Sequence, residues 1–154
     1  IIVMKFSNIQ IFSLAILFLV SCNEKQKKEK TIKRTQSETE FKSNPLKESV
    51  ARGRLVYNDF CITCHMASGE GVANVFPPIA NSDYLKNNQL QSLKGIKFGQ
   101  KGEIIVNGKT YNGAMAALGL DDDEVADVMN YINNSWGNKY GNLITEEEVA
   151  KIEK

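Results

Sequence analysis

The chain has 154 residues, of which 42% are hydrophobic and 24% are charged, a size and composition that suit one globular domain with terminal segments. Its formal net charge of +1 argues against nucleic-acid binding, which normally requires an excess of basic residues. The charge is uneven, because residues 23–48 carry eight Lys and Arg against five Asp and Glu, whereas residues 49–154 carry ten against thirteen. The sequence therefore predicts a mildly acidic domain preceded by a basic segment.

Residues 1–21 have the pattern of a bacterial export signal. Lys5 supplies a short positive region, and residues 9–20 form an apolar run with only two polar interruptions. Because a bilayer-spanning helix needs about 20 apolar residues, this run is short for a permanent anchor. It ends in Leu-Val-Ser-Cys at residues 19–22, which resembles the bacterial lipobox, where cleavage precedes a cysteine that then receives lipid. We expect a signal peptide and a lipidated Cys22; an ordinary signal peptide with an accidental cysteine is the alternative.

Residues 22–43 are charged and polar. They contain too few apolar side chains to offset the entropy that ordering would cost, so we expect a flexible tether. Its lysines could contact anionic lipid headgroups, but a solvated linker explains them equally well.

The next segment predicts a helix that begins at Asn44-Pro45, because these residue types suit the N-cap and the first helical position. Apolar or small residues then recur at helical spacing, at Val50, Gly53, Val56 and Phe60. A glycine inside a helix costs about 1 kcal/mol relative to alanine. Gly53 therefore indicates a close approach by another element.

The motif Cys61-Ile62-Thr63-Cys64-His65 has the spacing for covalent attachment of a c-type haem. Each thiol would add to one haem vinyl group, and the histidine that follows would bind the iron. A redox disulfide and half of a zinc site are the alternatives. A zinc site would need another Cys or His, but the only other thiol is Cys22, and His65 is the sole histidine. We therefore predict one haem, attached through Cys61 and Cys64, with His65 as the proximal ligand.

These features resemble the class I cytochromes c. Gly53, an aromatic residue four positions later (Tyr57) and the haem motif are similar to the N-terminal helix of that family. The resemblance implies an all-α fold whose helices wrap around one haem, with a minor β-hairpin near residues 104–111. It also implies that Gly53 and Tyr57 meet Val128 and Tyr131 of the C-terminal helix.

A loop with Val-Phe-Pro-Pro-Ile at residues 75–79 follows the haem motif. In class I cytochromes, a proline carbonyl in this region accepts the Nδ1 proton of the proximal histidine, which fixes the ring and strengthens its bond to iron. The resemblance gives this role to Pro77 or Pro78. A rigid turn without that role is the alternative.

Residues 82–85 predict a short capped helix, and a second helix is expected from about residue 88 to residue 96, with Leu90 and Leu93 facing inward. Residues 104–111 predict a small hairpin, because their central Asn-Gly suits a type I′ turn between β-rich runs. This hairpin should lead directly to the distal side of the haem.

The sixth ligand of the iron is expected to be a methionine, since the chain has no second histidine. Met4 lies in the leader, Met66 follows the proximal ligand too closely, and Met129 lies on the apolar stripe of the last helix. Met115 remains, on a loop where class I cytochromes carry their distal methionine, although alanines replace the prolines that follow it in many relatives. We therefore predict His65 and Met115 as the metal ligands.

Asp121 and Glu124 have the spacing of a capping box at the start of the last main helix. Its apolar face is expected to contain Val125, Val128, Met129 and Ile132. Residues 127–132 resemble the C-terminal helix of class I cytochromes, and Trp136 lies at the end of the helix.

We place the cytochrome c domain at residues 44–138 and a C-terminal extension at residues 139–154. Thr145 and Glu148 would cap a short helix in this extension that runs to Lys154. The extension lies outside the family pattern, and the sequence assigns it no function.

The leading interpretation is a monohaem electron carrier, not an enzyme, without a small-molecule substrate. It would be lipid-anchored in the bacterial cell envelope, facing the periplasm, where c-type haem is attached, and its partners would be an oxidase, reductase or dehydrogenase. One alternative is an electron entry or exit subunit of a larger oxidoreductase. Another is a gas-binding or peroxidase-like protein with a labile Met115, although the distal stretch lacks His and Arg. Four lysines could form a docking patch, or could simply be solvated: Lys94, Lys97, Lys101 and Lys109.

Overall fold

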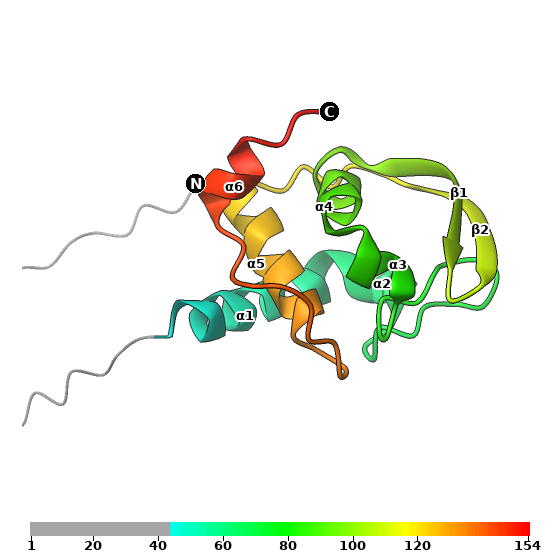
Figure 1. Cartoon of the computed structure of the whole chain (residues 1–154), viewed down its shortest axis with the longest axis horizontal. Coiled ribbons are helices and arrows are strands. Elements are labelled where there is room, and N and C mark those ends of the chain that lie inside the picture. The colour runs from blue at the N-terminus through cyan, green and yellow to red at the C-terminus, as the bar shows by residue number, and fades with distance from the viewer. Residues whose placement is uncertain (1–43) are drawn as a thin grey trace, which may run out of the picture. The chain divides into compact units, whose positions relative to one another are not determined.

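The computed structural model describes residues 44–154 (Figure 1). The predictions for the signal peptide, for the tether and for Cys22 lie outside the described residues. In chain order, the elements are α1 (Pro45–Val56), the π-helical segment η1 (Tyr57–Cys61), α2 (Ile62–His65), α3 (Asp83–Asn87), α4 (Gln89–Phe98), β1 (Gln100–Val106), β2 (Lys109–Met115), α5 (Asp122–Asn133) and α6 (Glu146–Ala150). Between residues 44 and 154, no helix has the length and apolarity needed to cross a bilayer.

Helices α1 and α5 cross in close contact, and Gly53 lies at the crossing point. A Cβ atom at Gly53 would overlap the backbone carbonyl of Asp127 and would lie 2.9 Å from Cβ of Tyr131. The predicted close approach is therefore confirmed. The atoms of α5 nearest to Gly53 belong to the backbone of Asp127 and to the predicted neighbour Tyr131, and Val128 is fully buried in the core.

The predicted helix starts are also confirmed. Asn44 caps α1 through its Oδ1 atom, which accepts a hydrogen bond from the amide of Lys47 at 3.1 Å, and Pro45 is the first helical residue. The Ser82 hydroxyl accepts a hydrogen bond from the amide of Leu85 at 3.1 Å. Asp121 opens α5 with the expected capping box.

The first helix changes its winding just before the haem motif, which the sequence did not predict. In η1, the amide of Ile62 donates to the carbonyl of Tyr57, five residues earlier. Such a π-turn breaks the α-helical spacing of the side chains and is frequent at functional sites. As a result Phe60 does not continue the buried face of Gly53 and Tyr57, and its side chain is 46% exposed.

Three aromatic side chains close the end of the α1–α5 contact. The ring of Tyr57 lies 5.3 Å from that of Tyr131 and 5.0 Å from that of Trp136, and the last two rings are 5.4 Å apart. Tilted and edge-to-face arrangements at these distances are favourable beyond simple burial. The cluster therefore fixes the start of η1 against the C-terminal end of α5.

The hairpin is longer than predicted. Its strands pair from Gln100 opposite Met115 to Val106 opposite Lys109, rather than over residues 104–111 alone. The turn has the predicted residues, and both adopt positive φ angles, 50° at Asn107 and 74° at Gly108, as a type I′ turn requires. The fold is thus mostly helical with one small antiparallel sheet.

Helix α4 begins near its predicted start but buries only part of the predicted face. Leu93 is buried, as expected. The prediction for Leu90 was wrong, because its side chain is 54% exposed. One apolar position per turn is too little periodicity to define the inner face of so short a helix.

The C-terminal extension packs against the main helices. Thr145 and Glu148 form the predicted capping box, but α6 ends at Ala150, well before the end of the chain. Val149 is fully buried in the core. Figure 1 shows α6 beside α5, at the end of the domain away from the hairpin.

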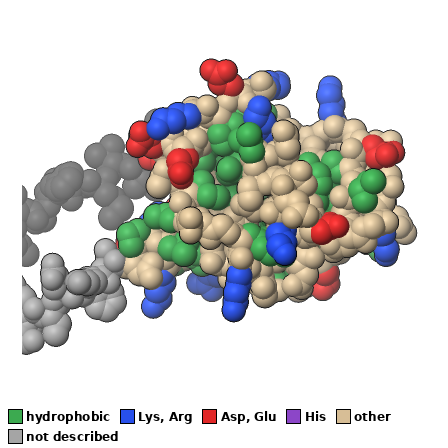
Figure 2. All heavy atoms as spheres, in the orientation of Figure 1, with side chains coloured by type: hydrophobic (Ala, Val, Ile, Leu, Met, Phe, Trp, Pro, Cys, Tyr) green, Lys and Arg blue, Asp and Glu red, His purple; other side chains and the backbone are tan. Residues whose placement is uncertain are grey.

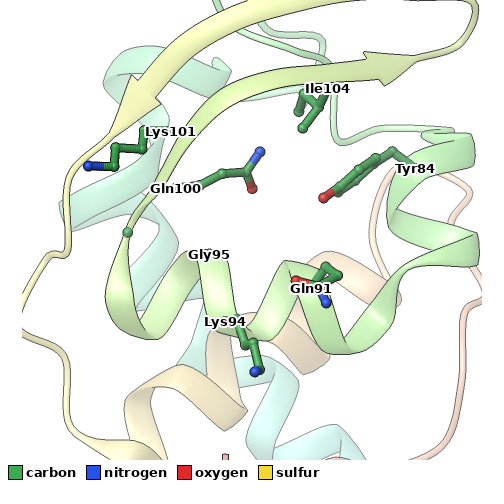
Figure 3. Close-up of a pocket in the computed structure, with 8 residues that line it drawn as sticks. Tyr84, Gln91, Lys94, Gly95, Gln100, Lys101 and Ile104 are labelled. Atoms are coloured by element: carbon green, nitrogen blue, oxygen red, sulfur yellow. The ribbon is translucent and has the colours of Figure 1, made fainter. Parts of the chain in front are cut away.

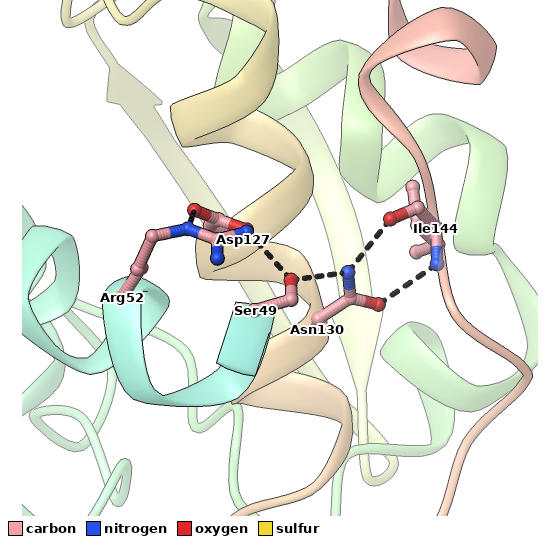
Figure 4. Close-up of polar contacts among 5 residues, drawn as sticks. All are labelled: Ser49, Arg52, Asp127, Asn130 and Ile144. Atoms are coloured by element: carbon pink, nitrogen blue, oxygen red, sulfur yellow. Dashed lines mark hydrogen bonds and ion pairs between the residues drawn. The ribbon is translucent and has the colours of Figure 1, made fainter. Parts of the chain in front are cut away.

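A buried polar network ties α1, α5 and the extension together (Figure 4). The hydroxyl of Ser49 donates to Oδ1 of Asp127 at 2.7 Å and accepts from Nδ2 of Asn130 at 2.8 Å. Arg52 donates to both carboxylate oxygens of Asp127, at 2.6 and 2.7 Å. Between residues 44 and 154, no buried side-chain polar atom lacks a hydrogen-bond partner.

Candidate functional site: an apolar cavity with thiol, imidazole and thioether groups

The structure brings the predicted site residues of the described chain to one cavity. The cavity has a volume of about 540 Å³, within the usual range for cofactor sites. It is lined by Cys61, Cys64, His65, Pro77, Pro78 and Met115. These residues come from η1, α2, the following loop and the end of β2, so the fold gathers segments that are up to half a domain apart in sequence.

The rest of the cavity wall is largely apolar, and most of it was not predicted. It includes Phe60, Phe76, Ile79, Ile96, Val106 and Leu118. The π-turn accounts for Phe60, since it turns this side chain out of the α1–α5 interface. The sequence offered no comparable signal for the others, because an apolar residue that faces a cofactor looks like any core residue. Such a wall excludes water from a bound group.

The hydrogen bonding of His65 determines which of its two ring nitrogens carries the proton. Its Nδ1 atom lies 3.0 Å from the carbonyl oxygen of Pro77. A carbonyl can only accept a hydrogen bond, so Nδ1 carries the proton and Nε2 keeps its lone pair. Burial lowers the pKa of His65, and the hydrogen bond to Pro77 opposes this shift. Of the two prolines named from the sequence, the contact is with Pro77; Pro78 only lines the cavity.

Two side chains fix the turn that follows His65. The Tyr57 hydroxyl donates to the carbonyl of Met66 at 2.7 Å, and the indole Nε1 of Trp136 donates to the carbonyl of Ala67 at 3.0 Å. Met66 itself adopts a φ angle of 63°, which is uncommon for a residue other than glycine. The aromatic cluster therefore holds the backbone beside His65 in place, a role that the sequence alone did not reveal.

The thiols do not have the features of a redox or zinc site. Cys61 and Cys64 form no disulfide. Burial, followed by the effect of Cys64, raises the pKa of Cys61 to about 11, whereas redox-active Cys-x-x-Cys pairs have lowered pKa values. In residues 44–154, no cluster of three or more His, Cys, Asp or Glu side chains could hold a metal ion. The two alternatives to haem attachment thus find no support in the geometry.

Met115 is the methionine of the described chain that lines the cavity. It is the last residue of β2, paired with Gln100 of β1, so the predicted loop position is wrong. Met129 is fully buried within α5 and belongs to the hydrophobic core, as predicted. The hairpin thus delivers Met115 to the cavity from a defined strand position.

A second, smaller pocket adjoins the cavity between α4 and β1 (Figure 3). Its volume is about 370 Å³, and it shares Tyr84, Gln100 and Ile104 with the larger cavity. Lys94 and Lys101 also line it.

Of the four lysines named as a docking patch, Lys97 is engaged within the domain. Lys97 forms an ion pair with Asp122 at 2.8 Å and donates to the carbonyl of Val149 at 2.9 Å, so its ammonium group serves to hold α4, α5 and α6 together. Figure 2 shows acidic and basic side chains interspersed over the visible face. A four-lysine docking patch would need Lys97 to be free, and the structure does not provide that.

The cavity fits a covalently attached haem. It has an apolar wall, two adjacent thiols with which vinyl groups can react, an imidazole whose Nε2 lone pair is available, and a thioether. Soft sulfur and imidazole donors without carboxylates suit haem iron. The fold and the donor set define a small c-type haem protein.

Comparison with known proteins agrees. The profile of the cytochrome c family matches residues 50–136. Cytochrome c-552 of Thermus thermophilus is 33% identical over 111 residues, covering 66% of this chain and 84% of that protein. The protein named alcohol dehydrogenase (quinone), cytochrome c subunit, from Gluconacetobacter polyoxogenes is 32% identical over 104 residues, covering 65% of this chain and 22% of that protein. The cbb3-type cytochrome c oxidase subunit FixP of Bradyrhizobium diazoefficiens is 35% identical over 92 residues, covering 56% of this chain and 30% of that protein.

The chain belongs to the cytochrome c family. Its cofactor is accordingly haem c with iron, held covalently, and the protein is an electron carrier rather than an enzyme. The predicted class I cytochrome fold and the predicted cofactor are thereby confirmed.

Proposed function

We propose that this cytochrome transfers single electrons between redox proteins through a haem whose iron is ligated by His65 and Met115. The observation that carries the proposal is that both side chains line one cavity, and that His65 keeps Nε2 free by donating Nδ1–H to Pro77. The bound haem iron would supply the chemistry by cycling between its ferrous and ferric states.

The side chains of the cavity have distinct roles in this proposal. Cys61 and Cys64 form the thioether bonds that fix the cofactor in the cavity. The carbonyl of Pro77 orients the ring of His65 and increases its basicity. Met115 would supply the second iron ligand of the chain. Its sulfur would favour the reduced iron, so the potential would be higher than with two nitrogen ligands. An iron held by both His65 and Met115 would leave no position for oxygen or peroxide.

The test is the spectrum of the matured protein and of a Met115→Ala variant. The wild type is expected to be low-spin in the ferric state, to show the weak red charge-transfer band of thioether-bound iron, and to bind carbon monoxide slowly when ferrous. Met115→Ala should remove the band, lower the potential and admit carbon monoxide. Met129→Leu is the control; as a core substitution of similar volume it should cost less than about 1.5 kcal/mol and leave the spectrum unchanged.

A high-spin wild type that binds carbon monoxide at once would contradict the proposal. Met115 would then be no permanent ligand, and a gas-binding or peroxidase-like role would become the better interpretation.

We also propose that lipid on Cys22 anchors the protein in the bacterial cell envelope, with the haem domain facing the periplasm. The support is the lipobox-like sequence at residues 19–22 and the export that haem c attachment requires. Mass spectrometry of the mature N-terminus is the test: the expected terminus is Cys22 carrying lipid, and Cys22→Ser should yield a soluble periplasmic form or an uncleaved precursor. A mature terminus at another residue would exclude this anchor.

A permanent place in a larger oxidoreductase is the second candidate. The support is that two of the relatives above are named as subunits of an alcohol dehydrogenase and of an oxidase, although this chain spans only 22% and 30% of their lengths. Gentle detergent extraction of native membranes separates the candidates. A stoichiometric oxidoreductase that remains bound favours the subunit role, whereas a free monohaem protein favours the diffusing carrier.

A further inference from the structure

Two glycines at the C-terminal end of α4 lie against Met115: Gly95 within the helix and Gly99 at its C-cap. Gly99 follows the last helical residue, Phe98, and has a non-helical backbone with a φ angle of 80°. A Cβ atom at Gly95 would lie 3.7 Å from Cε of Met115, and a Cβ atom at Gly99 would lie 2.8 Å from the carbonyl oxygen of Met115. At the end of α4, Gly95 thus lies beside the tip of the Met115 side chain, and Gly99 lies beside the Met115 backbone.

Gln100 completes this contact. It is the cross-strand partner of Met115 in the hairpin, and its Oε1 atom would lie 3.0 Å from a Cβ atom at Gly95. Both side chains line the haem cavity. Figure 3 shows Gln100 facing Tyr84 across the adjoining pocket, above the helix that carries Gly95. The amide of Gln100 and the methyl group of Met115 therefore lie side by side over the same glycine.

The backbone does not require glycine at position 95. Gly99 has a φ angle of 80°, in the region that other residues adopt rarely, but Gly95 has no positive φ angle. Inside a helix, glycine is less favourable than alanine. What Gly95 provides is space, and the atoms that use this space belong to Gln100 and Met115.

We propose that Gly95 is a positioning residue for the sixth iron ligand: by seating Gln100 and Met115 side by side, it sets how far the Met115 sulfur extends into the cavity. This inference rests on the proposed His65 and Met115 ligation. A Cβ atom at position 95 would crowd Oε1 of Gln100, at 3.0 Å, but would only touch Cε of Met115, at 3.7 Å. A single methyl group therefore acts through Gln100, and a larger side chain also acts on Met115 directly. The expected effect therefore increases with the size of the new side chain.

The experiment compares the matured wild type with Gly95→Ala and Gly95→Val. The red thioether band should weaken from the wild type to the alanine variant and be largely lost in the valine variant, while the rate of carbon monoxide binding to the ferrous protein rises several-fold in the same order. Alanine favours the helix, so Gly95→Ala is expected to fold even if Gly95→Val does not. Leu90→Val is the matched control, because it introduces valine into α4 at an exposed position and should leave band and rate unchanged.

Gln100→Ala tests the route of the effect. If the side chain of Gln100 transmits the displacement, Gly95→Ala should have a smaller effect on the band in the Gln100→Ala background than alone. A thioether band that is equal in the wild type, Gly95→Ala and Gly95→Val would overturn the role of Gly95 while leaving Met115 ligation intact. A wild type without the band would overturn the ligation itself, and the positioning role with it.

Discussion

The side-chain amide of Asn130 pairs with the backbone of Ile144. Nδ2 of Asn130 donates to the carbonyl of Ile144 at 2.7 Å, and the amide of Ile144 donates to Oδ1 of Asn130 at 2.9 Å. The same Nδ2 group donates to the hydroxyl of Ser49 at 2.8 Å. One fully buried side chain on α5 therefore connects α1 with the segment that leads into α6, as Figure 4 shows.

The first prediction concerns this connection. Asn130→Leu keeps a similar volume but leaves both backbone groups of Ile144 without their partner, and each unsatisfied buried group costs about 1–3 kcal/mol. We expect the free energy of unfolding to fall by about 2 kcal/mol or more, measured by denaturant titration. Hydrogen exchange at the Ile144 amide should also become faster.

Asn134→Leu is the matched control, since Asn134 lies four residues further along, is exposed, and contacts only the carbonyl of Asn130 through its side chain. Its effect on stability should be small. Equal effects of the two substitutions would mean that the C-terminal segment is not held by Asn130.

The second prediction concerns the crossing of α1 and α5. Gly53→Ala places a methyl group against the backbone carbonyl of Asp127, which cannot rotate away as a side chain can. The typical cost of such overpacking is about 1–3 kcal/mol, and it exceeds the gain of up to about 1 kcal/mol from helix propensity. Thermal unfolding should therefore occur at a lower temperature.

Ala51→Gly in the same helix isolates the propensity effect, because Ala51 is exposed. It should cost about 1 kcal/mol. If Gly53→Ala instead stabilised the protein by the amount that Ala51→Gly destabilises it, Gly53 would have no close neighbour, and the crossing would be wrong.

The elements that the sequence predicted well are those with local signals. Asn44-Pro45, Asp121 with Glu124, and Asn107-Gly108 each determine a helix start or a turn through contacts within four residues, so their chemistry can be read directly. The π-turn at η1 and the exposed side of Leu90 depend instead on what packs against the helix. Helical periodicity assumes regular winding, and it therefore could not predict where Phe60 points.

The same distinction between local sequence signals and features that depend on packing applies to the site. The spacing of Cys61, Cys64 and His65 is a covalent requirement of the cofactor and is visible in the sequence. The choice between Pro77 and Pro78 depends on which carbonyl faces the imidazole, and only the path of the loop decides this. The contact of Gly95 with Met115 joins a helix to the far strand of a hairpin, and no pattern of neighbouring residues encodes it.

The third prediction is a pH dependence that Tyr57 controls. Its hydroxyl is buried and donates to Met66, and burial raises its pKa well above the usual value of 10.0. Above pH 10 the unfolded chain releases this proton and the folded protein keeps it, so Tyr57 lowers the stability as the pH rises, by up to about 1.4 kcal/mol per pH unit.

Tyr57→Phe removes both the hydrogen bond and the titration. At neutral pH the free energy of unfolding of the variant should be about 1 kcal/mol lower than that of the wild type. Above pH 10 the wild type loses stability and the variant does not, so this difference should shrink and the variant should then become the more stable protein. Denaturant titrations of both proteins across this range provide the measurement. If the free energies of unfolding of the two proteins differed by the same amount at all pH values, the fold would not hold the Tyr57 hydroxyl in its protonated form.

The last prediction concerns haem attachment. In a host with the maturation machinery for haem c, the wild type should retain its haem through denaturing electrophoresis, because two thioether bonds survive unfolding. Cys61→Ala combined with Cys64→Ala should abolish this covalent retention. The double variant should also lose thermal stability, since the apolar wall of the 540 Å³ cavity then lacks a fixed occupant and is exposed to water. Cys22→Ser is the control, because this third thiol lies outside the motif and its loss should leave the haem attached. A colourless product with bound zinc from the same host would contradict the haem assignment of the two cysteines.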